Sequence, residues 1–464
     1  MASNVRKNVL TALVEWETSQ KDILFAHPYT KDLDARDRAF AKRLTEGCLE
    51  RQIELDYLLD QASKTPIRTQ KPLIRCLLRM SLYQILYMDA VPNHAAISEA
   101  QKCADHFHFS GLKPYISGIL HHFARHKDTL RYPDPQKDLL YALSVKVSIP
   151  QWILRLWLEA YGEEILLPMV ESFFTPRPVT VTFHTKLTPM EQQAYLDQWR
   201  ELGVGIQRGA YVPHCYELTH LFGVDALPGF LEGAFYVQDQ SSALAVQAAG
   251  IRPGDLVVDI CAAPGGKTIA AAMLGARVLS RDVSDRKIQR LQENITRLSH
   301  IPSPLHITTQ IWNAQETDES LLGKADVVLM DVPCSGLGVM GKKPDLKYRL
   351  TPEGIASLQC LQKEIVAHSW QYLKPGGILL YSTCTLNPAE NEEMIAMMTT
   401  QFPLDLVSLS SDLPKEIRAA ASQTGSIRKG SECATEVENA CVTLFPGFFE
   451  TDGFFFAKMQ RRYT

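Results

Sequence analysis

Short runs of apolar, often β-branched residues alternate with helical patterns through the chain after Gly233. Each run is followed by glycine or polar residues and then by a stretch with apolar residues at helical spacing. Such alternation is typical of βαβ units, which build parallel sheets covered by helices. We therefore predict a doubly wound, Rossmann-like α/β domain over residues 235–464. Its predicted strands are Leu256–Ile260, Arg277–Arg281, Leu305–Ile311, Asp326–Met330 and Gly377–Ser382.

The first 130 residues follow a different pattern. From residue 4 to about residue 127, apolar residues recur at helical spacing, as in Val5 and Val9, and glycines are few. Pro66, Pro72 and Pro92 fall between the periodic stretches, where proline would stop a helix. We predict an all-α domain over residues 1–130 with about five or six helices.

A shorter region of mixed character lies between these two domains. The two prolines in Arg131–Pro135 disfavour helix and predict a connector. The alternating run Pro178–Phe183 suits a half-buried strand, and helical patterns occur near Trp152–Tyr161 and Pro189–Leu202. We predict a small α/β subdomain over residues 131–234. Three domains also fit the length of 464 residues, because single cores stop growing at about 250 to 300 residues.

The distribution of charge restricts where a nucleic acid could bind. A net charge of −4 argues against a polyanion-binding surface over the whole molecule, so such contact needs a local basic surface. Residues 1–130 hold 18 Lys and Arg against 15 Asp and Glu, and 7 of the 13 His. The all-α domain and the small α/β subdomain are the predicted places of contact, through basic residues such as Arg36, Arg38, Lys42 and Arg43. A charged helical face that is only solvated is the alternative.

Cysteine usage and hydropathy bear on the compartment. The 10 cysteines form no C-x-x-C pair, and the N-terminus lacks the pattern of a secretory signal, so reduced thiols are predicted. No apolar run approaches the roughly 18 to 20 residues that cross a bilayer. We expect a cytoplasmic protein that does not insert into membranes.

The strand Leu256–Ile260 runs into a loop of small residues and then into a helix. Small residues let a ligand approach backbone amides, and ligands of open α/β sheets lie beyond the carboxyl ends of the strands. Asp282, roughly 20 residues further on, ends the next strand and can accept hydrogen bonds from ribose hydroxyls. We predict a cofactor loop formed by Cys261, Ala262, Ala263, Pro264, Gly265, Gly266 and Lys267.

The letters Gly266-Lys267-Thr268 invite comparison with the phosphate loop of nucleoside triphosphatases. That pattern requires a glycine where this chain has Cys261, so we reject a phosphate loop. The G-x-G-x-x-G spacing of a dinucleotide site is absent too. A tight turn without a ligand remains the alternative.

Two cysteines follow predicted strands of the α/β domain. Cys334 lies just after Asp331, at the end of the fourth strand, and Cys384 follows the fifth. A single cysteine is more often a small buried apolar residue. Both cysteines should nevertheless reach the edge of the sheet that carries the cofactor loop, because the carboxyl ends of parallel strands meet there. The pair indicates thiol chemistry beside a cofactor.

These motifs resemble the Nol/Nop/Sun family of RNA cytosine-5 methyltransferases, in its bacterial 16S rRNA branch with a NusB-like N-terminal domain. The resemblance runs nearly end to end. Cys261–Thr268 matches the family's C-A-A-P-G-G-K-T, and the proline-cysteine and threonine-cysteine motifs follow in the family's order. The other matching segments are Tyr236–Ser242, Asp452–Ala457, Asp37–Phe40 and Pro92–Ile97.

The resemblance implies a NusB-like all-α domain, an RRM-like small subdomain and S-adenosylmethionine as cofactor, with no metal. It implies that Cys384 attacks carbon 6 of the cytosine and that Cys334 assists the later loss of a proton or release of product. Asp331 should hold the cytosine edge beside the cofactor. Asn313 stands where the family usually has an acid that binds the adenine amino group, and its amide oxygen can still accept that hydrogen bond.

The implied partner is 16S ribosomal RNA, free or in an early small-subunit precursor, and the implied state is a monomer. Methylation of transfer RNA is the alternative within the same enzyme class, and a non-catalytic RNA-binding factor is the alternative outside it. A cysteine protease is less favoured, because no histidine lies at a recognisable spacing from Cys384. The most polar segment, Ala419–Glu438, is predicted to be a loop insertion.

Overall fold

The structure is a computed structural model that describes residues 5–19, 33–221, 223–301, 305–409, 411–418, 427–428 and 440–463. The chain divides into two units, residues 1–159 with 343–349, and residues 160–342 with 350–464. This division into two units does not test the boundaries of the three predicted domains, which remain predictions. Apart from residues 427–428, the predicted loop Ala419–Glu438 lies outside the described residues.

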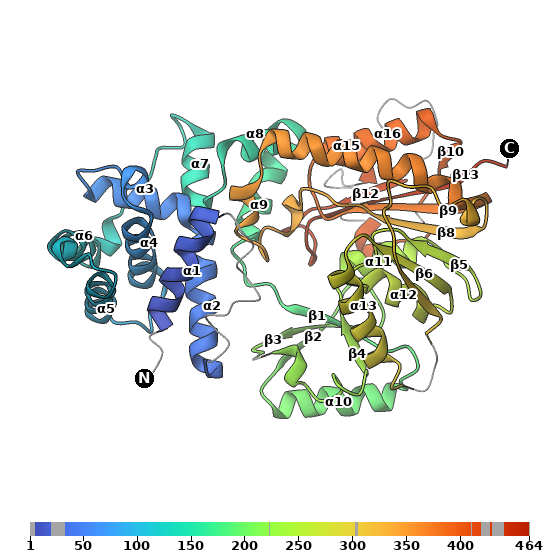
Figure 1. Ribbon diagram of the computed structural model, residues 1–464, viewed down its shortest axis with the longest axis horizontal. Coiled ribbons are helices and arrows are strands. Elements are labelled where there is room, and N and C mark those ends of the chain that lie inside the picture. Colours follow the sequence, from blue (N-terminus) through green and yellow to red (C-terminus); the bar gives the residue numbers. More distant parts are fainter. Residues whose placement is uncertain are drawn as a thin grey trace. The chain divides into compact units, whose positions relative to one another are not determined.

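The first unit is helical, as the apolar spacing of its sequence predicts (Figure 1). Proline begins helices here: Pro72 is the first residue of α4, and Pro92 directly precedes α5. The fixed φ of proline suits the first helical turn, where its missing N–H has no partner to lose. The helices are α1 (Val5–Ser19), α2 (Ala35–Glu50), α3 (Gln52–Ala62), α4 (Pro72–Tyr87), α5 (Asn93–His106), α6 (Lys113–His126), α7 (Leu139–Val147), most of α8 (Gln151–Tyr161) and the short α14 (Leu346–Arg349).

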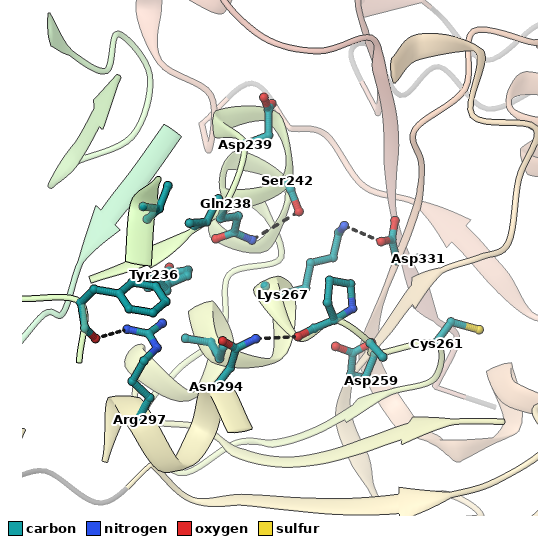
Figure 2. A pocket seen from close by; sticks show the side chains of 18 of the residues that line it. Tyr236, Gln238, Asp239, Ser242, Asp259, Cys261, Lys267, Asn294, Arg297 and Asp331 are labelled. Carbon is teal, nitrogen blue, oxygen red and sulfur yellow. Dashed lines mark hydrogen bonds and ion pairs between the residues drawn. The ribbon is translucent and has the colours of Figure 1, made fainter. Parts of the chain in front are cut away.

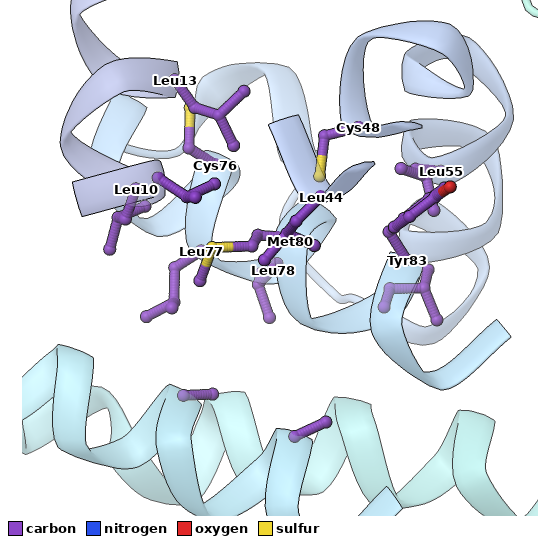
Figure 3. Packing of buried hydrophobic residues seen from close by; sticks show 14 of the residues in the cluster. Leu10, Leu13, Leu44, Cys48, Leu55, Cys76, Leu77, Leu78, Met80 and Tyr83 are labelled. Carbon is purple, nitrogen blue, oxygen red and sulfur yellow. The ribbon is translucent and has the colours of Figure 1, made fainter. Parts of the chain in front are cut away.

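Helix α4 forms the centre of this helical core (Figure 3). Leu77 and Leu78 are fully buried, and Leu10 of α1 packs in the same cluster. Each such leucine contributes about 1.5 to 3 kcal/mol when it leaves water. Helix α2 comes close because it has glycine at residue 47, where a Cβ atom would lie 2.0 Å from the ring of Tyr83. The helical core therefore depends on the close contact between α2 and α4 as well as on the apolar spacing within each helix.

Residues 343–349, which follow the proline-cysteine motif in the sequence, pack with the helical unit. The ring of Tyr348 lies 6.0 Å from that of Trp16, edge to face, and its hydroxyl donates to Ser148 O at 3.2 Å. Lys347 is buried beside it, and its Nζ donates to Glu50 O at 2.9 Å. Burial lowers the pKa of Lys347 to about 7. Neither the sequence pattern nor the motifs predict this placement.

The second unit begins with α9 (Glu163–Ser172) and a four-stranded antiparallel sheet in the order β2-β3-β1-β4. The core of this sheet is aromatic. Phe183 of β1 stacks on Trp199 of α10 at 5.3 Å, and Phe235 of β4 packs against Trp199 edge to face at 5.0 Å. The predicted strand and helix of the small subdomain are both present. The elements are β1 (Val179–Phe183), α10 (Pro189–Glu201), β2 (Gly205–Arg208), β3 (Cys215–Thr219) and β4 (Phe235–Val237).

The larger sheet carries all five strands predicted for the α/β domain, and they are parallel neighbours in the order β9-β8-β5-β6-β7. The sheet also contains antiparallel strands beside the predicted parallel ones, so it is mixed. Strand β13 pairs antiparallel with β9, and β12 and β10 pair antiparallel with β13. The strands are β5 (Leu256–Asp259), β6 (Arg277–Asp282), β7 (Ile307–Ile311), β8 (Ala325–Asp331), β9 (Leu373–Thr383), β10 (Leu404–Leu406), β11 (Ile427–Arg428), β12 (Cys441–Leu444) and β13 (Phe454–Arg461).

Helices cover both faces of this sheet (Figure 1). Val257 packs in a cluster with residues of α11 and α12, whereas the next residue, Val258, packs in a cluster with residues of α15 and α16. Successive strand residues point to opposite faces, so both faces need apolar cover. The helices are α11 (Gln240–Ala248), α12 (Gly266–Met273), α13 (Asp285–Leu298), α15 (Pro352–Ser369) and α16 (Glu392–Gln401). In the part of the chain that the structure describes, no helix has the length and apolar character needed to cross a bilayer.

Candidate active site

The carboxyl ends of three neighbouring strands bring the predicted site residues to one edge of the sheet. Strand β8 lies between β5 and β9. The loop after β5 begins near Cys261, β8 ends at Asp331, and Cys384 directly follows β9. Parallel strands in adjacent positions therefore place these three segments side by side.

A cavity of about 560 Å³ lies at this edge and between it and the small sheet (Figure 2). Of the predicted cofactor residues, Cys261, Ala262, Ala263, Pro264, Gly266, Lys267 and Asp331 line it. Gly265, Asp282, Asn313 and the two cysteines of the predicted thiol pair are not among its lining residues. Residues outside the predicted cofactor set also line it, among them Gln238 and Ser242 of the matching segment Tyr236–Ser242, and Asp259, Asn294 and Arg297.

Gly265 shapes the loop without lining the cavity. Its φ of +109° lies in the left-handed region, and a Cβ atom there would come within 2.2 Å of Leu291 Cδ1. Both facts require glycine at this position. Helix α12 starts at the next residue, Gly266, so its first N–H groups face the loop. A loop of small residues at a helix N-terminus can bind an anionic group such as a carboxylate.

Two buried oxygens on the cavity wall point to a ligand with N–H donors. Asp259 Oδ1 and Gln238 Oε1 have no hydrogen-bond partner among the described residues. The other oxygen of Asp259 accepts from Thr268 Oγ1 at 2.7 Å. Burial raises the pKa of Asp259 to about 7. An unpaired buried acceptor costs about 1 to 3 kcal/mol, so a bound ammonium or amino group would stabilise this wall.

Asp282 and Asn313 are both engaged within their own turns. Asp282 is buried at the end of β6, where Oδ1 accepts from Ser284 N at 3.1 Å and Oδ2 lies 3.5 Å from Lys287 Nζ. Asn313 Oδ1 accepts from Gln315 N at 3.2 Å, although the geometry leaves the second lone pair of that oxygen available. Roles in holding ribose and adenine remain predictions for these two residues.

Lys267 and Asp331 form an ion pair across the cavity, with Nζ and Oδ2 2.7 Å apart (Figure 2). The lysine is almost fully buried, whereas the side chain of Asp331 keeps 36% of its exposure. The second carboxylate oxygen accepts from Ser382 Oγ of β9 at 2.9 Å, and the ammonium also lies 5.0 Å from the ring centre of Phe454. The carboxylate therefore has a fixed orientation and still faces the cavity.

The two predicted cysteines come together, with their Sγ atoms 3.5 Å apart. Both side chains are partly buried. The pKa of the Cys334 thiol lies well above its usual value, first because of the hydrogen bond with Cys384 and then because of burial. Cys334 therefore keeps its proton more readily than an ordinary thiol. The nine cysteines that the structure describes are all free thiols.

A buried carboxylate that the sequence analysis missed ties the two cysteine loops together. Glu390 accepts from Ser335 N at 2.9 Å and from Ser335 Oγ, on the loop of Cys334. It also accepts from Asn387 Nδ2 at 2.8 Å, on the loop of Cys384, and from Gln362 Nε2 at 3.0 Å. No ion pair to this carboxylate occurs within the described ranges of the chain. Only four hydrogen-bond donors compensate its burial.

Asn391, the next residue, holds the chain on both sides of Cys384. Its Oδ1 accepts from Thr383 Oγ1 at 2.6 Å, and its Nδ2 donates to Thr385 O at 3.0 Å. Buried amides with both ends satisfied fix backbone conformation. The only sequence signal for Glu390 and Asn391 was a pair of polar residues shortly after a catalytic motif.

Two other motif residues meet through a lysine that no motif contains. Lys342 Nζ lies 3.1 Å from Asp239 Oδ2 and 2.6 Å from Asp452 Oδ2. Asp239 also caps α11 by accepting from Ser241 N at 3.0 Å. Burial raises the pKa of Asp452 to about 7, and the nearby charge of Asp239 adds to the effect. This cluster links three parts of the chain: the segment Tyr236–Ser242, the loop after Cys334 and the start of β13.

Comparison with known proteins identifies the family. A family model described as 16S rRNA methyltransferase RsmB/F matches residues 246–460, and the NusB family model matches residues 3–125. A Bacillus subtilis (strain 168) relative, named probable ribosomal RNA small subunit methyltransferase B, is 30% identical over 471 residues, 99% of both chains. The chain belongs to the RsmB/F family. The resemblance inferred from its motifs is thereby confirmed at the level of the family.

Other relatives of this RsmB/F chain agree. The ribosomal RNA small subunit methyltransferase B of Proteus mirabilis (strain HI4320) is 31% identical, over 79% of this chain and 84% of that protein. A solved structure titled methyltransferase homolog protein from Pyrococcus horikoshii is 27% identical and covers 70% of this chain and 99% of its own, with a TM-score of 0.57. The predicted fold class, a NusB-like helical domain followed by a Rossmann-like methyltransferase domain, is confirmed.

Proposed function

We propose that this protein transfers a methyl group from S-adenosylmethionine to carbon 5 of a cytosine in 16S ribosomal RNA, through a covalent adduct with Cys384. The observation that carries the proposal is the pair of thiols 3.5 Å apart at the carboxyl edge of the sheet. Asp331, on the strand beside Cys384, faces the adjoining cavity. A nucleophile, a proton-holding group and a polar base-binding group thus share one edge.

A thiol is required because carbon 5 of cytosine is a weak nucleophile. Addition of the Cys384 thiolate to carbon 6 forms a sulfur–carbon bond and moves electron density to carbon 5. Carbon 5 then takes the methyl group, and the bond between the methyl group and the donor sulfur breaks, with its electron pair staying on that sulfur. The carbon-5 proton leaves to a base, and the electron pair of that carbon–hydrogen bond forms the carbon 5–carbon 6 double bond and expels the sulfur of Cys384. The thiolate is regenerated, and the ring regains its double bond.

The contact between the two sulfurs supports a later role for Cys334. In the free enzyme its pKa is raised chiefly by the hydrogen bond with Cys384, so it stays protonated. Once Cys384 is bonded to carbon 6, its sulfur carries no negative charge and accepts a hydrogen bond poorly. The main cause of the raised pKa is then removed, so Cys334 can lose its own proton to solvent and, as a thiolate, accept the proton from carbon 5.

The cavity residues fit a methyl donor that carries an ammonium, a carboxylate and an adenosine. The unpaired oxygen of Asp259 suits an amino or ammonium donor, and the N-terminus of α12 at Gly266 suits a carboxylate. Asp282 and Asn313 are proposed for the ribose and the adenine. When bound, S-adenosylmethionine supplies an electrophilic methyl group to a carbon nucleophile.

Asp331 is proposed to accept a hydrogen bond from the exocyclic amino group of the cytosine. Its orientation is fixed by Lys267 and Ser382, while part of its surface stays open to the cavity. A base inside a duplex cannot reach such a position, so the target cytosine must be single-stranded or flipped out. The names of the relatives and the NusB match support ribosomal RNA as the substrate.

The proposal can be tested with purified protein, S-adenosylmethionine labelled in its methyl group, and transcripts of 16S rRNA and transfer RNA in parallel. After digestion to nucleosides, we expect label in 5-methylcytidine from 16S rRNA alone. Label from transfer RNA instead would favour the alternative enzyme. Binding of both cofactor and RNA without any methyl transfer would favour the RNA-binding factor.

A further inference from the structure

A second cavity, of about 520 Å³, lies between α5 and α6 of the helical unit. We propose that this α5–α6 cavity binds single-stranded RNA, by its phosphates and one or more unstacked bases. The inference rests on the proposed function and names where the helical domain grips its substrate. The lining residues are Gln101, Lys113, Pro114, Ser117, Gly118, His121, His122, Arg125 and His126.

The ionisable side chains that line this cavity are all basic. It contains a lysine, an arginine and three histidines, and no acidic residue. Arg125 and His121 are exposed, and neither has a hydrogen-bond or ion-pair partner among the residues that the structure describes. A guanidinium without a carboxylate partner is well suited to a phosphate, which it binds through two parallel N–H groups. The cavity therefore favours a polyanion.

One acid approaches the cavity, and its contact is weak. Lys113 Nζ lies 2.7 Å from Asp105 Oδ2, with the two side chains 36% and 45% exposed. Exposed ion pairs of this kind contribute about 0 to 1 kcal/mol, so a phosphate can replace the carboxylate at little cost.

Imidazole rings make RNA a better fit than a protein with acidic side chains. The rings of His122 and His126 lie 4.6 Å apart with an angle of 32° between their planes, and both residues are exposed. His126 Nδ1 contacts His122 O at 2.8 Å, which fixes the outer ring. Flat rings beside cationic groups are how proteins stack unpaired RNA bases while holding the backbone.

Two small residues, Ser117 and Gly118, are among the residues that line the cavity. A Cβ atom added at Gly118 would meet no atom within 4 Å. Gly118 lies inside α6, where glycine is about 0.8 to 1.0 kcal/mol less favourable than alanine. A ligand that comes close to the backbone at Gly118 would explain why α6 has glycine there despite the loss of helix stability.

Two of the four basic residues of α2 that the sequence predicts as RNA contacts lie near an acid of the same helix. Lys42 lies 3.9 Å from Glu46, and Arg43 lies 4.0 Å from Glu50. These acids offset part of the positive charge of α2. The α5–α6 cavity has no such acid among its lining residues, so we expect it to contribute more to RNA binding.

The test uses the full-length protein and a fluorescent single-stranded fragment of 16S rRNA, with affinity measured over a range of salt concentrations. We expect Arg125→Glu to weaken binding about tenfold or more and to lower the salt slope by about one. Gly118→Glu should act similarly by filling the cavity with charge. Gly118→Ala, the matched control, should bind RNA normally and keep or raise helix stability. Lys324→Glu, at an exposed lysine just before β8 in the other unit, should change affinity less than about twofold.

Normal affinity in both Arg125→Glu and Gly118→Glu would overturn the inference. An equal loss in Lys324→Glu would overturn it as well, because the loss of affinity would then be a general effect of charge. Binding of an acidic peptide by the wild type in competition with RNA, with unchanged RNA affinity in the variants, would assign the cavity to a protein. Formation of 5-methylcytidine by the wild type tests the proposed function separately, so either claim can fail alone.

Discussion

The sulfur atoms of Cys334 and Cys384 lie 3.5 Å apart although 50 residues separate them in the chain. Adjacent parallel strands, β8 and β9, create this contact, because each cysteine follows the carboxyl end of one of them. At this distance the two sulfur atoms contact each other. We propose that the two cysteines act in sequence on one substrate atom or its neighbour.

Cys334→Ala should trap the enzyme on its product. Without this thiol the proton on carbon 5 leaves slowly, so the bond between Cys384 and carbon 6 persists. We expect a protein–RNA complex that survives denaturing gel electrophoresis, which the wild type forms only in trace amounts. Cys360→Ala, at an exposed cysteine, is the control and should behave as wild type. Clean turnover by Cys334→Ala without such a complex would remove the proposed role.

Glu390→Gln should slow methyl transfer more than it weakens cofactor binding. A glutamine turns one acceptor into an N–H donor, which would face the N–H of Ser335 or the amide of Asn387. We expect a loss of about 10- to 100-fold in kcat, as a catalytic group moves out of place. The KM for S-adenosylmethionine should change little. Glu393→Gln, at the exposed surface of α16, is the control, and an equal effect on kcat and cofactor affinity would indicate a merely structural role.

Lys267→Met should impair catalysis by releasing Asp331. Removing the ammonium leaves a carboxylate free to turn away from the cytosine. Lys267→Met and Asp331→Asn should each lower single-turnover methyl transfer strongly, and their combination should lose little more than the worse of the two. Lys374→Met removes an exposed ion pair with Asp326 and should stay near wild type. Additive losses would show that the two residues act independently.

Lys347→Met should stabilise the protein at neutral pH. The pKa of Lys347 is about 7 in the folded protein, whereas an unfolded lysine has a pKa of about 10.4. Between these values the unfolded chain binds a proton that the folded chain does not, so the stability of the wild type rises with pH. The slope is up to about 1.4 kcal/mol per pH unit, and below pH 7 the penalty is complete.

The measurement is urea denaturation of wild type and Lys347→Met between about pH 7 and about pH 10, a window that lies between the two pKa values. The variant should be more stable at the acidic end and lose the slope that this lysine causes. Lys343→Met, at an exposed neighbour, should follow the wild-type curve. Parallel curves for wild type and Lys347→Met would show that Lys347 keeps its charge when folded.

The sequence predicts those parts of the fold that depend on local periodicity. Apolar spacing predicts α1 to α6, because each helix buries one apolar face. It also predicts the five parallel strands, because each strand is buried on both faces. It does not predict that the sheet is mixed. Strand β13 has the same apolar pattern in either direction, and only its pairing with Thr383 and Ser382 of β9 fixes it as antiparallel.

The site is predictable to the extent that its residues lie in a motif at a strand end. Cys334, Cys384, Lys267 and Asp331 come together as the strand order requires. Glu390 could not be found in this way, because its importance lies in hydrogen bonds between loops that are distant in the sequence. The packing of residues 343–349 with the helical unit escaped prediction for the same reason.

The most direct test of the account asks which atom of the protein bonds to the RNA. A 16S rRNA transcript containing 5-fluorocytidine should stop the reaction after methyl transfer, because fluorine cannot leave carbon 5 as the proton does. Protease digestion and mass spectrometry should then find the nucleotide attached to Cys384. Attachment to Cys334, or methyl transfer with no protein–RNA bond, would contradict the account.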